Sequence, residues 1–260
     1  MGVAIRLTNV SKAFKVEGKR APLLSVLKGA VQRKKPEDVR FSLRDVNLTI
    51  RRGERVGLIG NNGAGKTSLL KLIAGLYQPT CGKIQVNGEI AFLAGFGIGM
   101  LDDLSVAENI FLYGAIYGVA RATTRKNLRE IVDWAGLSEF VDTKFKHLSS
   151  GMKTRLAFST TRYFDADIYL LDEALSAGDQ DFRKKCEQVF DSYKHTARTM
   201  VIASHTMAFL EQFCDKTIWL DKGRLVTFGP TEEIIRRYAP TTPDLADGQK
   251  PVAPPVEIGK

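Results

Sequence analysis

The sequence predicts an α/β fold with a helical lobe inserted into its core, and two observations support this prediction. Short apolar runs at 56–59, 168–171 and 199–203 have the length and composition of buried parallel strands. Between the first two runs, residues 105–162 show a mostly helical pattern of apolar positions. The chain has 260 residues, enough for one large domain with a sizeable core.

The N-terminal part predicts two strands separated by a basic insertion. Residues 3–10 alternate between apolar and polar side chains, and 45–50 form a second strand pattern. Between them, at roughly 15–41, basic residues outnumber acidic ones, and 23–31 could form a short amphipathic helix. Two interpretations stay open: a solvated surface insertion, or a basic element that faces lipid headgroups or a membrane partner.

The middle of the chain predicts helices and strands in alternation. A glycine-rich turn and a helical pattern from about 65 to 74 follow the first apolar run. Two short strands are expected within 83–93, around the turn Asn87-Gly88. A further helix near 180–194 separates the second and third apolar runs.

The C-terminal part predicts a hairpin, a helix and a tail. Residues 221–224 have the composition of a hairpin turn between two late strands. Proline and acidic residues at 230–233 are typical of a helix N-terminus. Five of the nine prolines lie after Ala239, so 240–260 is expected to be an extended or disordered tail.

The composition excludes several classes of protein. The formal net charge of +9 favours an anionic partner, such as a nucleotide, a nucleic acid or an anionic membrane surface, without choosing among them. The longest stretches without Asp, Glu, Lys or Arg have 12 residues, whereas a membrane-spanning helix needs roughly 20 apolar residues. The first ten residues do not resemble a signal peptide, and three widely spaced cysteines indicate a reducing cytosol rather than a disulfide framework. Small secreted domains, collagens, porins and zinc-ribbon proteins are therefore not expected.

A phosphate-binding loop is the most specific motif in the chain. The pattern G-x-x-x-x-G-K-[ST] is met by Gly60, Asn61, Asn62, Gly63, Ala64, Gly65, Lys66 and Thr67. The glycines allow the backbone to curl so that N–H groups point at phosphate oxygens, and the outgoing helix adds its positive N-terminal end. Lys66 can reach the β- and γ-phosphates, and Thr67 can bind Mg²⁺. The complete pattern in this context argues against a chance glycine-rich loop.

Three further groups could complete a phosphate site. At the end of a strand beside the loop, Asp172 could bind Mg²⁺ and Glu173 could polarise the attacking water. Ser149 lies in LSSGM (148–152) before a helical pattern, either as an ordinary N-cap or as part of a second anion site. His205 follows the third apolar run and is either structural or a group that contacts the γ-phosphate.

Taken together, the loop 60–67, LSSGM, LLDE (170–173) and the following histidine resemble the ATP-binding subunit of an ABC transporter, over about residues 1–235. The stretches 149–159 and 176–186 and the long N-terminal insertion are most similar to exporters of polysaccharides, of the capsule, O-antigen or teichoic-acid type. The resemblance implies a P-loop NTPase core with a mixed sheet, an antiparallel β region and a helical lobe at about 95–162. It places the nucleotide-binding domain at 1–239.

The resemblance also implies roles for individual residues. Lys66, Glu173 and His205 are the implied catalytic residues, with Glu173 as the general base and His205 as the switch histidine. Thr67 and Asp172 are the implied Mg²⁺ ligands. Besides the loop residues, the resemblance implies a nucleotide-binding role for Ser68 and for Phe14, which would stack on adenine. Ser149 and Gly151 would contact ATP bound to the other subunit, and Asp179 would lie at the dimer interface. Phe14 could instead be a core or loop residue, and Phe41 competes with it for the stacking position.

The chain departs from the commoner family pattern in two places. The signature reads LSSGM, where the common form has two glycines and a glutamine. Residues 93–100 lack the glutamine that in most members touches Mg²⁺ and relays to the membrane subunit, so the coupling contact is unassigned. About 21 residues follow Ala239, too few for a carbohydrate-binding domain, so this chain itself is not expected to bind the glycan.

The function implied by the resemblance is ATP hydrolysis coupled to export. ATP and Mg²⁺ are the implied cofactors, and the implied partners are a second copy of the chain and an integral membrane transport subunit that carries a polysaccharide or glycolipid. The expected location is peripheral, at the cytoplasmic face of the inner (plasma) membrane. The alternatives are a drug or lipid exporter, an ABC-type ATPase that acts on nucleic acid, and a regulatory nucleotide binder. No nucleic acid is expected, because the sequence shows no long coiled-coil insertion, zinc element or second cassette.

Overall fold

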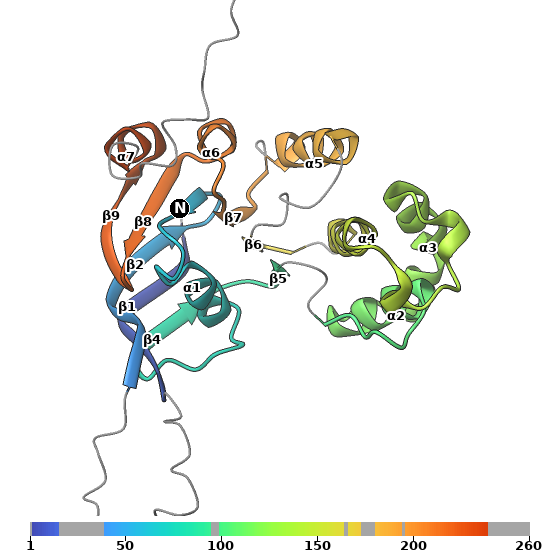
Figure 1. Ribbon diagram of the computed structural model, residues 1–260, viewed down its shortest axis with the longest axis horizontal. Coiled ribbons are helices and arrows are strands. Elements are labelled where there is room, and N and C mark those ends of the chain that lie inside the picture. Colours follow the sequence, from blue (N-terminus) through green and yellow to red (C-terminus); the bar gives the residue numbers. More distant parts are fainter. Residues whose placement is uncertain are drawn as a thin grey trace, which may run out of the picture.

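The computed structural model describes residues 2–15, 39–94, 99–163, 166–172, 180–193 and 196–238 (Figure 1). Most of the predicted basic insertion, the predicted site residues Glu173 and Asp179, and the predicted tail lie outside these described residues.

A six-stranded mixed sheet forms the centre of the fold, in the order β5-β6-β7-β3-β8-β9. Neighbouring strands are parallel except for the antiparallel pair β8–β9. The strands are β3 (Arg55–Ile59), β5 (Ile90–Ala94), β6 (Ile168–Asp172), β7 (Thr199–Ala203), β8 (Lys216–Asp221) and β9 (Arg224–Pro230). The three apolar runs are β3, β6 and β7, which confirms their prediction as buried parallel strands.

A second, antiparallel sheet has three strands in the order β2-β1-β4. These strands are β1 (Val3–Lys15), β2 (Val39–Arg51) and β4 (Cys81–Val86). The two strands expected around Asn87-Gly88 exist as β4 and β5, but they belong to different sheets and do not form a hairpin. Instead, β4 pairs with β1 and β5 pairs with β6, and the Asp167 carboxylate before β6 accepts a hydrogen bond from the Glu89 N–H (2.9 Å) before β5.

The central sheet has a separate apolar core on each face. In β7, Met200 and Ile202 face one core, whereas Val201 and Ala203 face the other, as the two-residue period of a strand requires. Helix α1 (Lys66–Ile73) packs between the two sheets. On the opposite face lie α5 (Gln180–Tyr193), α6 (Met207–Phe213) and α7 (Thr231–Tyr238), as Figure 1 shows. Of these, α6 was not predicted, because seven residues are too few for a clear helical period.

A helical lobe lies beside the β5 edge of the sheet (Figure 1). It contains α2 (Val106–Ile116), α3 (Arg121–Ala135), α4 (Ser150–Arg162) and two short 3₁₀ helices, η2 (Ser138–Phe140) and η3 (Phe145–His147). Trp134 of α3 stacks on Phe158 of α4 (ring centroids 5.7 Å apart), and Phe158 meets Phe182 of α5 edge-on (5.9 Å). This aromatic cluster joins the lobe to the core.

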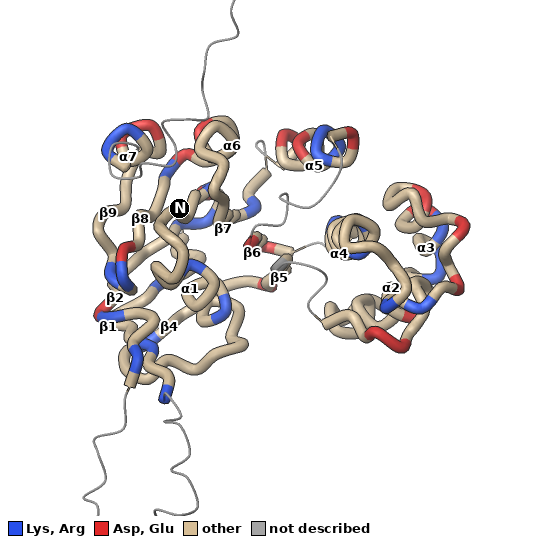
Figure 2. Tube along the Cα trace, viewed as in Figure 1, with Lys and Arg blue, Asp and Glu red and all other residues tan. Residues whose placement is uncertain are grey.

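The described part of the chain contains no helix with both the length and the apolar character needed to span a bilayer. Lys and Arg are spread over both sheets and the helices (Figure 2). The three cysteines are free thiols in the structure.

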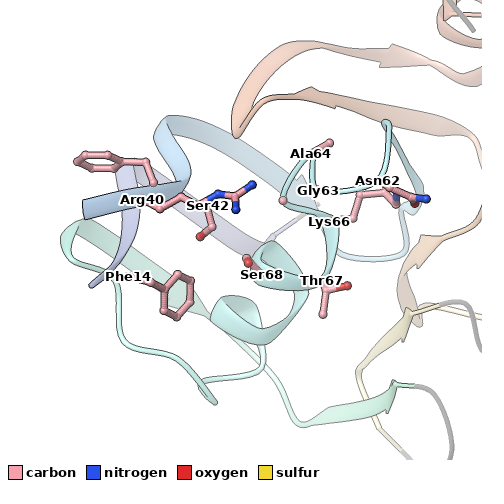
Figure 3. Close-up of a pocket in the computed structure, with 11 residues that line it drawn as sticks. Phe14, Arg40, Ser42, Asn62, Gly63, Ala64, Lys66, Thr67 and Ser68 are labelled. Carbon is pink, nitrogen blue, oxygen red and sulfur yellow. The ribbon is translucent and has the colours of Figure 1, made fainter. Parts of the chain in front are cut away.

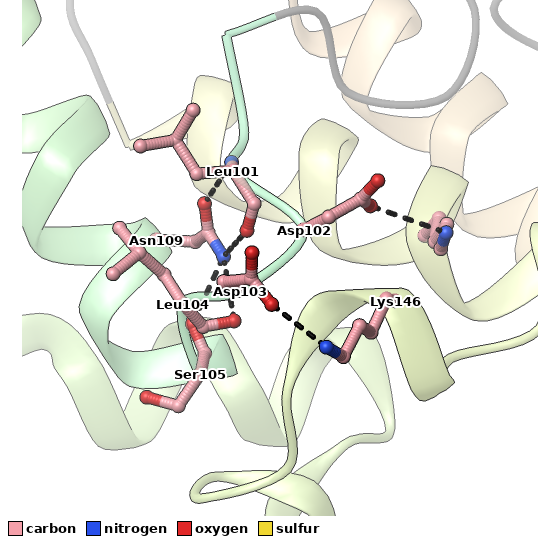
Figure 4. Close-up of polar contacts among 8 residues, drawn as sticks. Leu101, Asp102, Asp103, Leu104, Ser105, Asn109 and Lys146 are labelled. Atoms are coloured by element: carbon pink, nitrogen blue, oxygen red, sulfur yellow. Dashed lines mark hydrogen bonds and ion pairs between the residues drawn. The ribbon is translucent and has the colours of Figure 1, made fainter.

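Asn109 holds the entry to the lobe. Its side chain is fully buried in α2, accepts a hydrogen bond from the Leu101 N–H (2.8 Å) and donates to the carbonyls of Leu101, Leu104 and Ser105 (Figure 4). On the outside of the same turn, Asp102 and Asp103 form ion pairs with Lys153 and Lys146, respectively. One buried amide therefore contacts four backbone groups of segment 101–105, with its two N–H protons shared among three carbonyls.

We expect Asn109→Ala to lower the free energy of unfolding by about 2–4 kcal/mol, because it leaves buried backbone groups without partners. Urea unfolding measures this loss. Asn47→Ala is the matched control, because Asn47 also makes amide hydrogen bonds but is exposed, and we expect it to lose less than about 1 kcal/mol. Equal losses in the two variants would contradict the role of burial at Asn109.

Candidate functional site

The glycine-rich loop 60–67 joins β3 to α1 and forms one wall of a pocket of about 370 Å³ (Figure 3). The strands β1 and β2 form the opposite wall. The pocket is lined by Phe14, Arg40, Phe41, Ser42, Asn62, Gly63, Ala64, Gly65, Lys66, Thr67 and Ser68. These described lining residues include two cations and no carboxylate, which favours an anionic ligand.

Two glycines of the loop occupy positions where a side chain would be both strained and in collision with its neighbours. Gly65 has a φ of 107°, and a Cβ there would lie 2.5 Å from the Ser42 carbonyl oxygen and 2.9 Å from Leu43. Gly60, with a φ of 148°, passes so close to the Leu220 carbonyl and Ala64 that a side chain would collide with both. The motif glycines are therefore needed for close packing as well as for the curl of the loop.

The loop is braced by the β8–β9 turn. The Gly223 N–H donates to the Ala64 carbonyl (3.0 Å), and the Gly223 carbonyl accepts from the Arg44 N–H (2.7 Å). Within the loop, the Ala64 N–H donates to the Asn61 carbonyl (3.0 Å). The loop thus has a fixed path, with Asn61, Asn62 and Gly63 exposed at its tip.

Lys66 is the buried cation of the site. Its side chain is 7% exposed, and the ammonium donates to the carbonyls of Gly60 (2.7 Å) and Asn61 (3.5 Å). A buried charge needs polar partners, which the curled loop supplies. This position puts the ammonium at the base of the loop, at the start of α1, where Thr67 and Ser68 follow it into the pocket (Figure 3).

The carboxyl ends of three parallel strands bring further site residues to the same sheet edge. Leu58 of β3 and Asp172 of β6 are both in register with Ala203 of β7. Neighbouring strands are about 4.8 Å apart, so the Asp172 backbone lies roughly 10 Å across the sheet from Leu58. The strand β7 separates β6, which ends at Asp172, from β3, which enters the loop. His205 follows the end of β7 and is exposed at this edge.

Ser149 lies in the helical lobe as the N-cap of α4. Its hydroxyl accepts a hydrogen bond from the Met152 N–H (3.2 Å), and Ser149 is exposed. Neither Ser149 nor Gly151 is among the described residues that line the pocket around Lys66. The structure therefore shows the ordinary capping role directly and does not bring LSSGM to the loop within one chain.

Both candidate aromatic residues line the pocket. Phe14 and Phe41 lie on paired strands and are each 39% exposed. The Phe14 ring meets Tyr77 edge-on (5.5 Å), whereas Phe41 lies against the Arg44 guanidinium (4.7 Å). Arg40 and Ser42 of β2 also line the pocket and were not predicted. Their position follows from pairing with β1 across a long interruption, which no local pattern signals.

Comparison with known proteins gives consistent matches. The family model described as ABC transporter matches residues 43–176. The O-antigen export system ATP-binding protein RfbB of Myxococcus xanthus is 38% identical over 242 residues, which are 90% of this chain and 55% of that protein. The teichoic acids export ATP-binding protein TagH of Staphylococcus haemolyticus is 32% identical over 92% of this chain and 89% of its own length. This chain thus spans only about half of the Myxococcus relative.

Among solved structures, a dimeric ATP-binding cassette in a post-hydrolysis state, bound to ADP and Pi, matches with a TM-score of 0.71. It is 22% identical, and the match covers 87% of this chain and 98% of that one. Because the sequence identity is low, this structural likeness establishes the fold alone. It confirms the predicted α/β architecture with a mixed sheet, an antiparallel sheet and a helical lobe.

Proposed function

Because this chain belongs to the ABC transporter family, we propose that it is the ATP-hydrolysing subunit of an exporter that moves a polysaccharide or glycolipid across the cytoplasmic membrane. The observation that carries the proposal is the loop 60–67, which forms one wall of a basic pocket with Lys66 at its base. The relatives are named as ATP-binding proteins of O-antigen and teichoic-acid export, which supports a polysaccharide or glycolipid as the cargo.

The loop and the start of α1 would bind the phosphates of ATP. The fold already orients the backbone N–H groups of the loop and the N-terminus of α1. Lys66 would donate hydrogen bonds to the β- and γ-phosphate oxygens from the base of the loop. Phe14 would stack on the adenine, with Phe41 on the adjacent strand as the competing residue. These contacts hold the substrate in one orientation, which is most of what phosphoryl transfer requires from the protein.

Mg²⁺ is proposed to bind through the Thr67 hydroxyl and the Asp172 carboxylate. Thr67 lies at the start of α1, which follows β3, and Asp172 is the last residue of β6, a strand of the same sheet. The described residues contain no group of three or more potential metal ligands of the His, Cys, Asp or Glu type. Mg²⁺ is often held by one or two protein oxygens together with phosphate and water. When bound, the ion would neutralise charge on the phosphates.

Two residues, Glu173 and His205, are proposed to act around the γ-phosphate, and a third, Asp179, at the dimer interface. Glu173, which follows Asp172, would accept a proton from the attacking water. His205, exposed at the end of β7, would orient the γ-phosphate. Asp179 would help to organise the dimer interface.

The proposed working unit is a two-fold dimer bound to a membrane subunit. Ser149 and Gly151 do not line the pocket of their own chain, which supports a role for the N-terminus of α4 at ATP bound to the other subunit. ATP would close the dimer, hydrolysis would open it, and the membrane subunit would convert this cycle into export. The chain would then lie at the cytoplasmic face of the inner (plasma) membrane.

We expect Ser149→Ala to leave ATP binding to the isolated chain unchanged and to reduce the ATPase rate of the assembled complex by about 10-fold or more. The control is Ser105→Ala. Ser105 caps α2 with the same 3.2 Å hydrogen bond, so both variants lose a similar N-cap contribution of about 1 kcal/mol. ATPase assays of both variants separate a contact at the nucleotide from a loss of helix stability. A similar rate in the two complexes would contradict the proposed contact between subunits.

The substrate class is tested with the chain purified in complex with its membrane subunit and reconstituted in vesicles. Phosphate release is measured with a lipid-linked glycan, with candidate drugs or other lipids, and with DNA or RNA. We expect stimulation by the glycan. Stimulation by drugs or other lipids, or salt-sensitive binding of nucleic acid without the membrane subunit, would favour the alternatives that the net charge of +9 leaves open.

A further inference from the structure

The C-terminal helix α7 touches the phosphate-binding loop at one defined point. Tyr238, the last residue of α7, donates a hydrogen bond from its hydroxyl to the Asn61 side-chain carbonyl oxygen (3.2 Å). The two residues are 177 positions apart in the chain. Tyr238 lies outside residues 43–176, the part that matches the family model.

Packing fixes the position of the Tyr238 hydroxyl. The side chain is only 4% exposed, and its ring meets Trp219 of β8 edge-on, with centroids 5.4 Å apart. At the other end of α7, the Thr231 hydroxyl is hydrogen-bonded to that of Thr217 (3.0 Å), also in β8. The helix is therefore held to β8 at both ends. A phenol with the ordinary pKa of 10 is already protonated at neutral pH, and burial raises the pKa of Tyr238 further, so its hydroxyl is available as a donor.

Asn61 is the residue at which contacts within the loop converge. Its backbone carbonyl accepts from the Ala64 N–H (3.0 Å) and from the Lys66 ammonium (3.5 Å), while its side chain accepts from Tyr238. Gly60 precedes it and Gly63 follows two residues later, both with positive φ. Glycines leave this part of the loop with many backbone conformations when it is not held from outside.

We propose that Tyr238 is a positioning residue for nucleotide binding, which restrains the phosphate-binding loop through Asn61 and so links the position of α7 to nucleotide affinity. The inference rests on the proposed function, because it concerns the same pocket. Tyr238 acts on the loop and not on the adenine or the attacking water. The affinities for ATP and for ADP should therefore depend on Tyr238 to a similar extent. The catalytic rate constant should not depend on it.

The test compares the full-length chain with Tyr238→Phe, which keeps the ring against Trp219 and removes only the hydroxyl. We expect the Kd values for ATP and for ADP to rise about 2–10-fold, as for loss of one hydrogen bond. In the ATPase assay, KM should rise by a similar factor while kcat changes less than about twofold. A general loss of stability would not give this separation of KM from kcat.

Tyr193→Phe is the matched control. Tyr193 is similarly buried (7% exposed), and its hydroxyl interacts with Tyr169, which lies near the start of β6 and away from the site. This variant loses a buried phenol hydroxyl without a contact to the loop, so its nucleotide affinity should equal that of the wild type. Thermal unfolding of both variants shows whether their stabilities are comparable.

A double-mutant cycle with Asn61→Ala tests the contact itself. If the hydrogen bond carries the effect, the double variant binds ATP no more weakly than the weaker of the two single variants. If the losses of ATP affinity in the two single variants were additive, or if Tyr238→Phe had an unchanged Kd, the inference would be overturned. The proposed function would still stand in that case, provided that the wild-type chain binds ATP. A wild-type chain that binds neither ATP nor ADP would overturn both.

Discussion

Replacing Lys66 with alanine is expected to weaken ATP binding by roughly 10–100-fold, because charge-assisted hydrogen bonds to the phosphates are lost. The rate of ATP hydrolysis should fall by at least about 100-fold, since the same ammonium would also stabilise charge that develops on the transferred phosphate. Titration with ATP and a phosphate-release assay measure the two effects separately.

Lys71→Ala is the control for Lys66→Ala. Lys71 lies in the same helix α1, but its ammonium is near the Tyr77 ring and it does not line the described pocket. We expect its ATP affinity and hydrolysis to match the wild type. Wild-type hydrolysis in Lys66→Ala, with Lys71→Ala also active, would contradict the placement of phosphate at the loop.

Replacing Glu173 with glutamine is expected to preserve ATP binding and to lower hydrolysis by about 10²–10⁴-fold, the usual contribution of a general base. Glutamine has nearly the same shape as glutamate but cannot accept the proton from water. The nucleotide-bound dimer should then accumulate, which light scattering in the presence of ATP and Mg²⁺ would detect. The substitution should therefore affect the rate of ATP turnover strongly and the affinity for ATP very little.

Glu211→Gln provides the comparison for Glu173→Gln. Glu211 is exposed in α6, so the same chemical change there should leave hydrolysis and association unaffected. If Glu173→Gln turned over ATP at the wild-type rate in the purified complex, Glu173 would not be the general base. A catalytically inactive variant that stayed monomeric with ATP would instead contradict the proposed dimer.

Local patterns were sufficient to predict the centre of the fold. The apolar runs that became β3, β6 and β7 could be recognised because both faces of these strands are buried, so nearly every residue is apolar. The loop 60–67 could be recognised because its glycines serve a backbone path that few other residues permit. The position of Asp172 at the end of β6 could be predicted for the same local reason, because it is a carboxylate at the end of an apolar run.

Contacts between distant segments could not be predicted in this way. The separation of β4 and β5 into two sheets involves pairing of β5 with β6, where Glu89 bonds to Asp167, 78 residues away. The contribution of Arg40 and Ser42 to the pocket depends on pairing with β1. The contact of Tyr238 with Asn61 depends on how α7 packs on β8. Each is a tertiary contact without a periodic or compositional signal.

The burial of α1 between the two sheets has a consequence for the energetics of binding. Leu69, Leu70, Leu72 and Ile73 anchor the helix in the core that both sheets share. The conformational entropy of α1, which supports the loop, is therefore lost when the chain folds and not when a ligand binds. A preorganised site of this kind retains more of its contact energy as affinity, and small ligands that carry only a phosphate chain should benefit from it as well as complete nucleotides.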